Sequence, residues 1–205
     1  MRYPKVRIIV LAYLLAGVVL LSPQVSFARR IRDVTQTDQL LTMPPPLEES
    51  SVLVLQGQAG IARGSSKQRY LITTGLSSCV AFTLYYRATK IGALAHMDIN
   101  YSNSDVMSAI QRIIDCMKDN GADLGHLEAG IIEGTEYSGA LIDAICQSFS
   151  TLGIKIVKRV GIQPFYLRSI AFDIETGELY NLSGLYTIDP PSSEYPALVK
   201  GDSII

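Results

Sequence analysis

Between residues 51 and 184, short β-rich segments alternate with two amphipathic helical segments, and this pattern limits the possible folds more than any other feature. β-branched and aromatic residues in apolar–polar alternation predict strands over 51–56, 69–73, 79–86, 90–99, 127–134, 154–161, 168–174 and 178–184. Apolar residues at helical spacing predict helices over 104–120, with Ser104 as N-cap, and over 138–152. Because strands outnumber helices and only two helical crossovers exist, we expect an α+β layered sandwich of mixed or antiparallel β-sheet with two main helices.

The first 28 residues have the layout of a secretory signal peptide. A basic start precedes an uncharged, mostly apolar run from Ile8 to Leu21, and Ser26 and Ala28 place small residues at a cleavage site. This 14-residue run is shorter than the roughly 20 residues that cross a bilayer, although an uncleaved signal anchor is the alternative. We therefore expect an exported protein, periplasmic or secreted, that meets the membrane only through this segment if it stays uncleaved.

The remaining chain divides into three parts by composition. Residues 29–50 predict an extended linker containing three prolines in a row, residues 51–188 the folded domain, and residues 189–205 a C-terminal tail rich in proline and serine. Residues 1–28 hold three of the 18 basic and none of the 19 acidic residues, so the rest carries a net charge of about −4. Since no basic stripe occurs in the sequence, a nucleic-acid partner is not expected.

The three cysteines leave at least one thiol unpaired in an exported chain. Cys116 and Cys146 lie in the two helical segments, where they can pair with each other or pack as two buried free thiols, since cysteine behaves as a small hydrophobe. The sequence leaves both options open. In either case, Cys79 is the cysteine that is expected to form no disulfide.

Cys79 stands between a turn of small residues and an apolar strand, in the stretch "TTGLSSCVAFTLYY". Gly75, Ser77 and Ser78 precede it, and a tight loop of this kind can aim several backbone N–H groups at one anion. The same N–H groups can form an oxyanion hole for a nucleophile. A thiol of ordinary pKa still needs a base to become a thiolate at neutral pH.

His96 is the candidate base. It lies on the apolar strand "IGALAHMDI", 17 residues after Cys79. If the two strands form a hairpin whose paired residue numbers add to about 175, Cys79 falls opposite His96. Taken singly, a lone histidine or cysteine on an apolar strand is more often a packed core residue, and only the predicted pairing favours chemistry. The other histidine, His126, is expected in a surface loop.

The stretch "TTGLSSCVAFTLYY…KIGALAH" resembles the motif of the chemoreceptor glutamine deamidase family (CheD), which has a Gly-Leu-Gly-Ser-Cys-Val turn and a Gly-x-x-x-His on the returning strand. Downstream, "EAGIIEGTEYSG", "LGIKIVKRVG" and "RSIAFDIETGELY" follow in the order of that family, so the resemblance covers roughly residues 51 to 184. The Leu-Ser-Ser-Cys step is also similar to the Leu-Ser-Gly-Cys of deamidase toxins such as cytotoxic necrotizing factor.

The resemblance implies a role for each matching residue. Cys79 would be the nucleophile, His96 the general base and Thr73 the polar group that orients the imidazole, with Thr74 beside it keeping that choice open. Arg168, retained from a Gly-Gly-Asn…Gly-Arg stretch, is a candidate substrate contact, and an ion pair with an acidic neighbour is the alternative. The implied activity is hydrolysis of a glutamine side-chain amide on a protein with an accessible glutamine, through a thioester, without a cofactor or metal.

Two departures from the family pattern keep other functions open. Ser77 replaces a glycine, which matters if the turn needs a positive φ. Pro164, Phe165 and Tyr166 replace most of the stretch before Arg168. An exported binding protein that keeps the fold without catalysis is one alternative. An esterase or transglutaminase that uses the same thioester is another.

Overall fold

The computed structural model describes residues 40–43, 46, 48–134, 138–162, 167–182 and 197–200. All of them belong to a compact unit that spans Val34–Ile205. The predicted signal peptide at 1–28 and residues 164–166 lie outside the described residues. Within the described part, no helix is long and apolar enough to cross a membrane.

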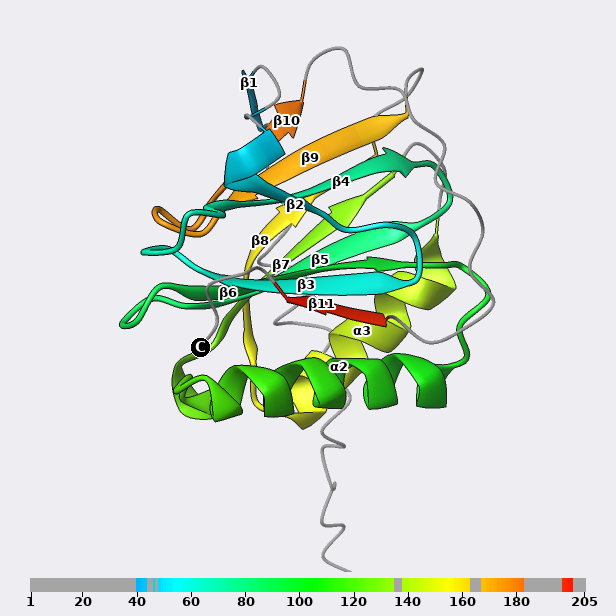
Figure 1. Cartoon of the computed structure of the whole chain (residues 1–205). Helices are drawn as coiled ribbons and strands as arrows, with labels where there is room; N and C mark the ends of the chain where they lie inside the picture. Colours follow the sequence, from blue (N-terminus) through cyan, green and yellow to red (C-terminus); the bar gives the residue numbers. More distant parts are fainter. Residues whose placement is uncertain are drawn as a thin grey trace, which may run out of the picture. The chain divides into compact units, whose positions relative to one another are not determined.

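Two β-sheets stack on each other, and two helices cover the outer face of the larger sheet (Figure 1). The six-stranded sheet contains, in spatial order, β11 (Ala197–Lys200), β3 (Gln58–Arg63), β6 (Ile91–Met97), β5 (Val80–Tyr86), β7 (Glu128–Glu133) and β8 (Lys155–Val160). The five-stranded sheet contains β1 (Leu41–Met43), β10 (Glu178–Leu182), β9 (Arg168–Asp173), β4 (Tyr70–Leu76) and β2 (Ser51–Leu53). Both sheets mix parallel and antiparallel pairs. The expected α+β sandwich is confirmed.

The two main helices are α2 (Asn103–Asp119) and α3 (Gly139–Thr151), and 3-10 turns occur at Glu48–Ser50 and Leu124–His126. The N-cap of helix α2 is Ser102, two residues before the predicted N-cap, Ser104. The Ser102 hydroxyl accepts the Asp105 N–H while the Asp105 carboxylate accepts the Ser102 N–H. This reciprocal capping box satisfies two N–H groups that the helix itself leaves open.

Three strands were not predicted from the sequence. β3 has the sequence QAGIAR, whose small residues give no β-branched pattern, and it forms because β6 and β11 supply hydrogen-bond partners on both sides. β1 pairs in parallel with β10, and β11 pairs in parallel with β3. These pairings bring short pieces of the predicted linker (29–50) and tail (189–205) into the sheets.

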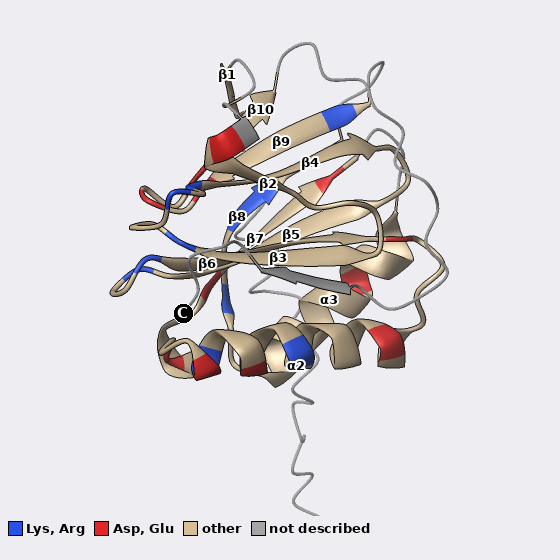
Figure 2. Ribbon diagram, viewed as in Figure 1, with Lys and Arg blue, Asp and Glu red and all other residues tan. Residues whose placement is uncertain are grey.

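The six-stranded sheet is the middle layer, so its central strands are buried on both faces. One face packs against the helices, with Phe82 meeting Phe149 edge to face at a centroid distance of 5.4 Å. The other face packs against the smaller sheet and includes Ala81 and Leu94. Burial on both faces explains why β5 and β6 are almost uninterrupted runs of apolar residues. Figure 2 shows the charged residues mainly on the turns and helices, with the strands largely free of charge.

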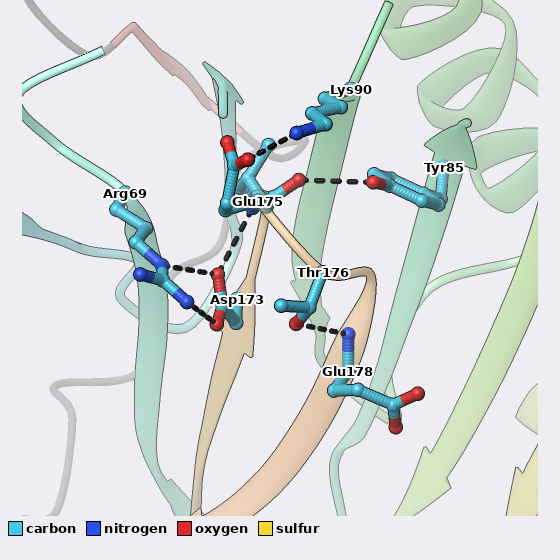
Figure 3. A network of polar contacts seen from close by, with 8 residues as sticks. Arg69, Tyr85, Lys90, Asp173, Glu175, Thr176 and Glu178 are labelled. Carbon is cyan, nitrogen blue, oxygen red and sulfur yellow. Dashed lines mark hydrogen bonds and ion pairs between the residues drawn. The ribbon is translucent and has the colours of Figure 1, made fainter. Parts of the chain in front are cut away.

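A set of polar contacts joins the β5–β6 turn to the β9–β10 turn, and Figure 3 shows its members. The Tyr85 hydroxyl donates to the carbonyl of Ile174 at 3.1 Å, and Lys90 forms an ion pair with Glu175. Arg69 binds both oxygens of the buried Asp173 carboxylate, with its Nε at 2.7 Å from one of them. We call these contacts the turn clamp, because Tyr85 and Lys90 tie the β9–β10 turn to the larger sheet and Arg69 ties it to β4, at the end farthest from the start of β5.

Replacing Tyr85 by phenylalanine tests the clamp. The variant keeps the ring but leaves the buried Ile174 carbonyl without its donor, so we expect the free energy of unfolding to fall by about 1–3 kcal/mol. Tyr86→Phe, at the neighbouring half-buried tyrosine, is the matched control and should change it by less than about 0.5 kcal/mol. Urea unfolding of the three proteins measures the difference. Equal stability of Tyr85→Phe and wild type would contradict the role of this contact.

Asp173 gives the turn clamp a pH dependence. Burial is the largest single influence and raises the pKa of this carboxyl group, but the hydrogen bonds and charge of Arg69, together with hydrogen bonds from Glu175 and Thr176, lower the pKa below its usual value. A carboxylate whose pKa is lower in the folded state stabilises the fold above its unfolded pKa of about 3.9, and this stability is lost as the pH falls. We therefore expect Asp173→Asn to destabilise the protein most near pH 7 and progressively less below about pH 4. Urea unfolding from pH 3 to 7 measures this, and a pH-independent difference would argue against it.

Candidate active site

Thr73 and His96 meet between the two sheets. Thr73 lies on β4 of the smaller sheet and His96 on β6 of the larger one, and both side chains are fully buried. The Thr73 hydroxyl oxygen is 2.8 Å from His96 Nδ1 and 2.7 Å from the carbonyl oxygen of Val54. Thr74, the alternative considered from the sequence, is not the residue that makes this contact. The hydroxyl therefore links a backbone carbonyl to the imidazole across the sheet interface.

The direction of these hydrogen bonds determines the histidine tautomer. The Val54 carbonyl has no proton to give, so the single hydroxyl proton of Thr73 is donated to it. The Thr73 oxygen can then only accept from His96, which means that Nδ1 carries the proton. In the neutral imidazole the lone pair is consequently on Nε2, which is buried. This is the nitrogen that a general base would use.

Cys79 lies on the same side of the sheet as His96, but two residue pairs away from it along the ladder, and not directly opposite as predicted. The structure pairs Val80 with Met97 and Ala81 with His96, so the paired numbers add to 177 and not 175. The predicted opposition of Cys79 and His96 is therefore wrong by two residues, because the hairpin turns one residue later. Residues two apart on a strand share a face, which makes Cys79 and His96 diagonal neighbours with a typical separation of about 7–8 Å between Cα atoms. Cys79 belongs to the same inter-sheet core as Ala81.

The turn before Cys79 is shorter than predicted. Gly75 is still part of β4, where it has φ +76° beside a bulge between Thr73 and Leu76, and only Ser77 and Ser78 form the turn itself. Apart from glycines, Lys90 is the one described residue with positive φ. Ser77 therefore has a backbone conformation that suits a residue with a side chain, and its replacement of the family glycine causes no strain.

Arg168 is buried near the start of β5, where it connects the two sheets. Its Nη1 donates to the backbone carbonyl of Glu133 at 2.6 Å, and its backbone pairs with Leu76. Burial lowers the pKa of Arg168 to about 10, although the nearby Glu133 charge opposes this shift. The Glu133 carboxylate itself faces Arg159 at 3.3 Å. The structure thus gives Arg168 a contact within the protein, and its contact with substrate stays a prediction.

Two segments near the thiol were not predicted from the sequence. One connects β2 to β3, and the other connects β6 to α2. Asp98 stands one residue past Met97, so the ladder brings it opposite Cys79, and it is 5% exposed. Its carboxylate accepts hydrogen bonds from the Gln56 side chain and from both nitrogens of Asn100. The Gly57 N–H donates to the His96 carbonyl at 2.9 Å. No motif marks these residues, because their importance comes from pairing across 40 residues of sequence.

Tyr101 lies in the same region. Burial, followed by the charges of Asp98, Asp105 and Cys79, raises its pKa to about 12. Its hydroxyl group therefore keeps its proton throughout the physiological pH range and acts as a neutral hydrogen-bonding group near the thiol.

The other two cysteines are separate from this site. Cys116 and Cys146 are both buried, and neither they nor Cys79 form a disulfide in the structure. Burial raises the pKa of the Cys146 thiol, which keeps it protonated at neutral pH.

A cavity of about 420 Å³ opens elsewhere between the sheets, lined among others by Thr83, Tyr85, Lys158 and Leu179. None of the predicted site residues lines it.

Proteins with similar sequences indicate which family this chain resembles. No family model matches the chain. The chain is 27% identical over 124 residues to the chemoreceptor glutamine deamidase CheD of Thermotoga maritima, covering 53% of this chain and 78% of that protein. It is 32% identical over 99 residues to the probable chemoreceptor glutamine deamidase CheD of Clostridium novyi, covering 44% of this chain and 61% of that protein.

Among solved structures, the Bacillus licheniformis hypothetical protein YfiH aligns with a TM-score of 0.40 at 12% identity, over 72% of this chain and 74% of that one. Both sequence relatives are described as chemoreceptor glutamine deamidases of the CheD family, one of them as a probable member, and this chain is similar to them in sequence.

Proposed function

We propose that this protein is a protein-glutamine deamidase with Cys79 as nucleophile, His96 as general base and Thr73 as the residue that orients the imidazole. The observation that carries the proposal is the hydrogen-bonded series from the Val54 carbonyl through Thr73 to His96 Nδ1, on the face of the sheet that Cys79 shares. This arrangement leaves Nε2 as the basic nitrogen. The descriptions of the two CheD relatives support glutamine as the substrate side chain.

In the first half of the reaction, His96 Nε2 takes the thiol proton and the Cys79 sulfur attacks the carboxamide carbon of a glutamine. The carbonyl oxygen becomes an oxyanion, for which the backbone N–H groups of the turn before Cys79 are the candidate donors. The tetrahedral species then collapses. The carbon–nitrogen bond breaks, the imidazolium returns its proton to the leaving nitrogen, and ammonia departs from a thioester.

In the second half, His96 Nε2 takes a proton from water, and the resulting hydroxide attacks the thioester carbon. The carbon–sulfur bond breaks, the sulfur regains a proton from the imidazolium, and glutamate is released. One amide and one water thus give one carboxylate and one ammonium ion. Throughout, the neutral Thr73 hydroxyl keeps the imidazole ring in one orientation while the ring gains and loses a proton twice.

The chemistry also allows a thioester to be attacked by an amine or formed from an ester, so transglutaminase and esterase activities remain the alternatives. Assays of ammonia release with and without an added primary amine, together with ester hydrolysis, separate the three. A non-catalytic binding protein would have none of these activities. We further propose that the protein acts after export, on the basis of residues 1–28. A mature chain that retains those residues after expression in a bacterial host would contradict export with cleavage.

Removing the nucleophile is the direct test. Cys79→Ala should lower glutamine deamidation by roughly a thousandfold or more, because the covalent route is lost. Cys146→Ala, which also removes a buried free thiol, is the matched control and should keep the activity of the wild type. The measurements are ammonia release and a one-dalton mass gain on a panel of purified glutamine-containing proteins. Undiminished activity of Cys79→Ala would end the proposal.

Thr73→Val tests the orienting role. Valine has the shape of threonine but cannot accept from His96 Nδ1 or donate to Val54, so we expect kcat/KM to fall about tenfold to a hundredfold and stability by about 1–3 kcal/mol. Thr73→Ser should restore most of the activity, since it keeps the hydroxyl. Thr74→Val is the control at the adjacent buried threonine and should affect kcat/KM far less. If Thr73→Val and Thr74→Val lose activity equally, the orienting role is wrong.

A further inference from the structure

The turn that carries Cys79 is held in place by residues that follow it by about 60 positions in the sequence. β7 ends beside the start of β5, because Val80 pairs with Glu133. Gly134, which follows this pair, and Ser138, which precedes α3, both lie beside the turn. Each makes one contact with the turn, and the two contacts involve the backbone carbonyls of Ser77 and Ser78.

The first contact requires glycine at position 134. A Cβ atom built on Gly134 would lie 2.0 Å from the Ser77 carbonyl oxygen and 2.8 Å from its carbonyl carbon, so no other residue fits without moving the backbone of the turn. The Ser77 carbonyl thus packs directly against the backbone of residue 134. This contact fixes the side of the turn on which the Ser77 carbonyl lies.

The second contact uses the side chain of Ser138. Ser138 is the N-cap residue of α3 and is 2% exposed, yet its hydroxyl makes no capping hydrogen bond with the helix. It donates to the Ser78 carbonyl instead. A serine at an N-cap normally accepts a backbone N–H and stabilises its helix by about 1 kcal/mol, so α3 forgoes this stabilisation while the turn gains a buried hydrogen bond.

The orientation of a carbonyl also determines the orientation of the next N–H. A trans peptide unit is planar, and its C=O and N–H bonds point in opposite directions; none of the described peptide bonds is cis. With the Ser77 and Ser78 carbonyls directed at Gly134 and Ser138, the N–H groups of Ser78 and Cys79 point away from that side. The directions of the Ser78 and Cys79 N–H groups are therefore fixed by these two contacts.

We propose that Ser138 and Gly134 are positioning residues for the oxyanion site. They hold the Ser78–Cys79 peptide so that the Cys79 N–H donates to the oxyanion formed during attack on a substrate amide. This inference rests on the proposed function, and it concerns a step separate from thiolate formation. His96 and Thr73 act on the deprotonation of the Cys79 thiol, whereas Ser138 positions the N–H group that stabilises the negative charge on the substrate oxygen.

Ser138→Ala is the test, and Ser148→Ala is its matched control. Ser148 lies in the same helix, is buried to a similar extent, and its hydroxyl likewise donates to a backbone carbonyl, that of Ala144 at 2.8 Å. Both variants lose one buried hydroxyl, so both should lose similar stability. Three quantities are measured on each full-length protein: kcat and KM for glutamine deamidation, the rate of Cys79 alkylation by iodoacetamide, and thermal unfolding.

We expect Ser138→Ala to lower kcat about tenfold to a hundredfold, somewhat less than the loss of an oxyanion-hole donor itself, with KM within twofold of wild type. Alkylation forms no oxyanion, so its rate should stay within twofold. Ser148→Ala should leave all kinetic quantities unchanged, and Ser138→Thr, which keeps the hydroxyl, should recover part of the lost kcat.

The inference alone is overturned if the wild type is active and Ser138→Ala is as active as Ser148→Ala. It is also overturned if alkylation slows in step with kcat, because Ser138 would then act on the thiol. A failure of the proposed function looks different: wild type and Cys79→Ala would release equal amounts of ammonia, and both proposals would fall together.

Discussion

The hydrogen bonds that join Val54, Thr73 and His96 are the constraint on which the rest of this structure depends. A polar imidazole buried between two apolar sheets would destabilise the fold unless its N–H found a partner. Thr73 on β4 of the small sheet is such a partner for His96 on β6 of the large sheet. The same contact selects the tautomer that leaves Nε2 basic. A requirement of folding and a requirement of the proposed chemistry are thus met by one interaction. At the opposite end of the sandwich, the turn clamp has only the structural role.

The proposed site is built on a sheet interface and not on a group of long loops. Thr73 and His96 lie within strands, and Cys79 immediately precedes one, so their relative positions follow from ladder register and sheet stacking. Gly134 and Ser138, which lie near the turn before Cys79 because β7 pairs with β5, contact its backbone carbonyls and help to hold its shape. Placing reacting groups on rigid elements reduces the reorganisation needed during catalysis.

Several features of the fold could be predicted because they have local causes. The strands β5 and β6, the two helices and the β9–β10 hairpin follow from periodicity and from glycines at turns. The strand β3 could not be predicted, since its alanines and glycine favour no strand until neighbouring strands offer hydrogen bonds on both sides. β1 and β11 were missed for the same reason. The position of the β5–β6 turn was wrong by one residue, which moved Cys79 by two residues relative to His96 while keeping both on one face.

The sequence by itself determined that Cys79 and His96 lie on the same face of one hairpin, because the alternation of side chains along a strand is a local property that survives an even-numbered error in register. Only the tertiary structure decided that Thr73 and not Thr74 meets the imidazole, because that choice depends on how the bulged strand β4 stacks on the other sheet. It likewise decided that the Ser138 hydroxyl turns from its own helix to the Ser78 carbonyl. Contacts between sheets and between distant segments produce no periodic pattern in the sequence, so they can be identified only in the tertiary structure.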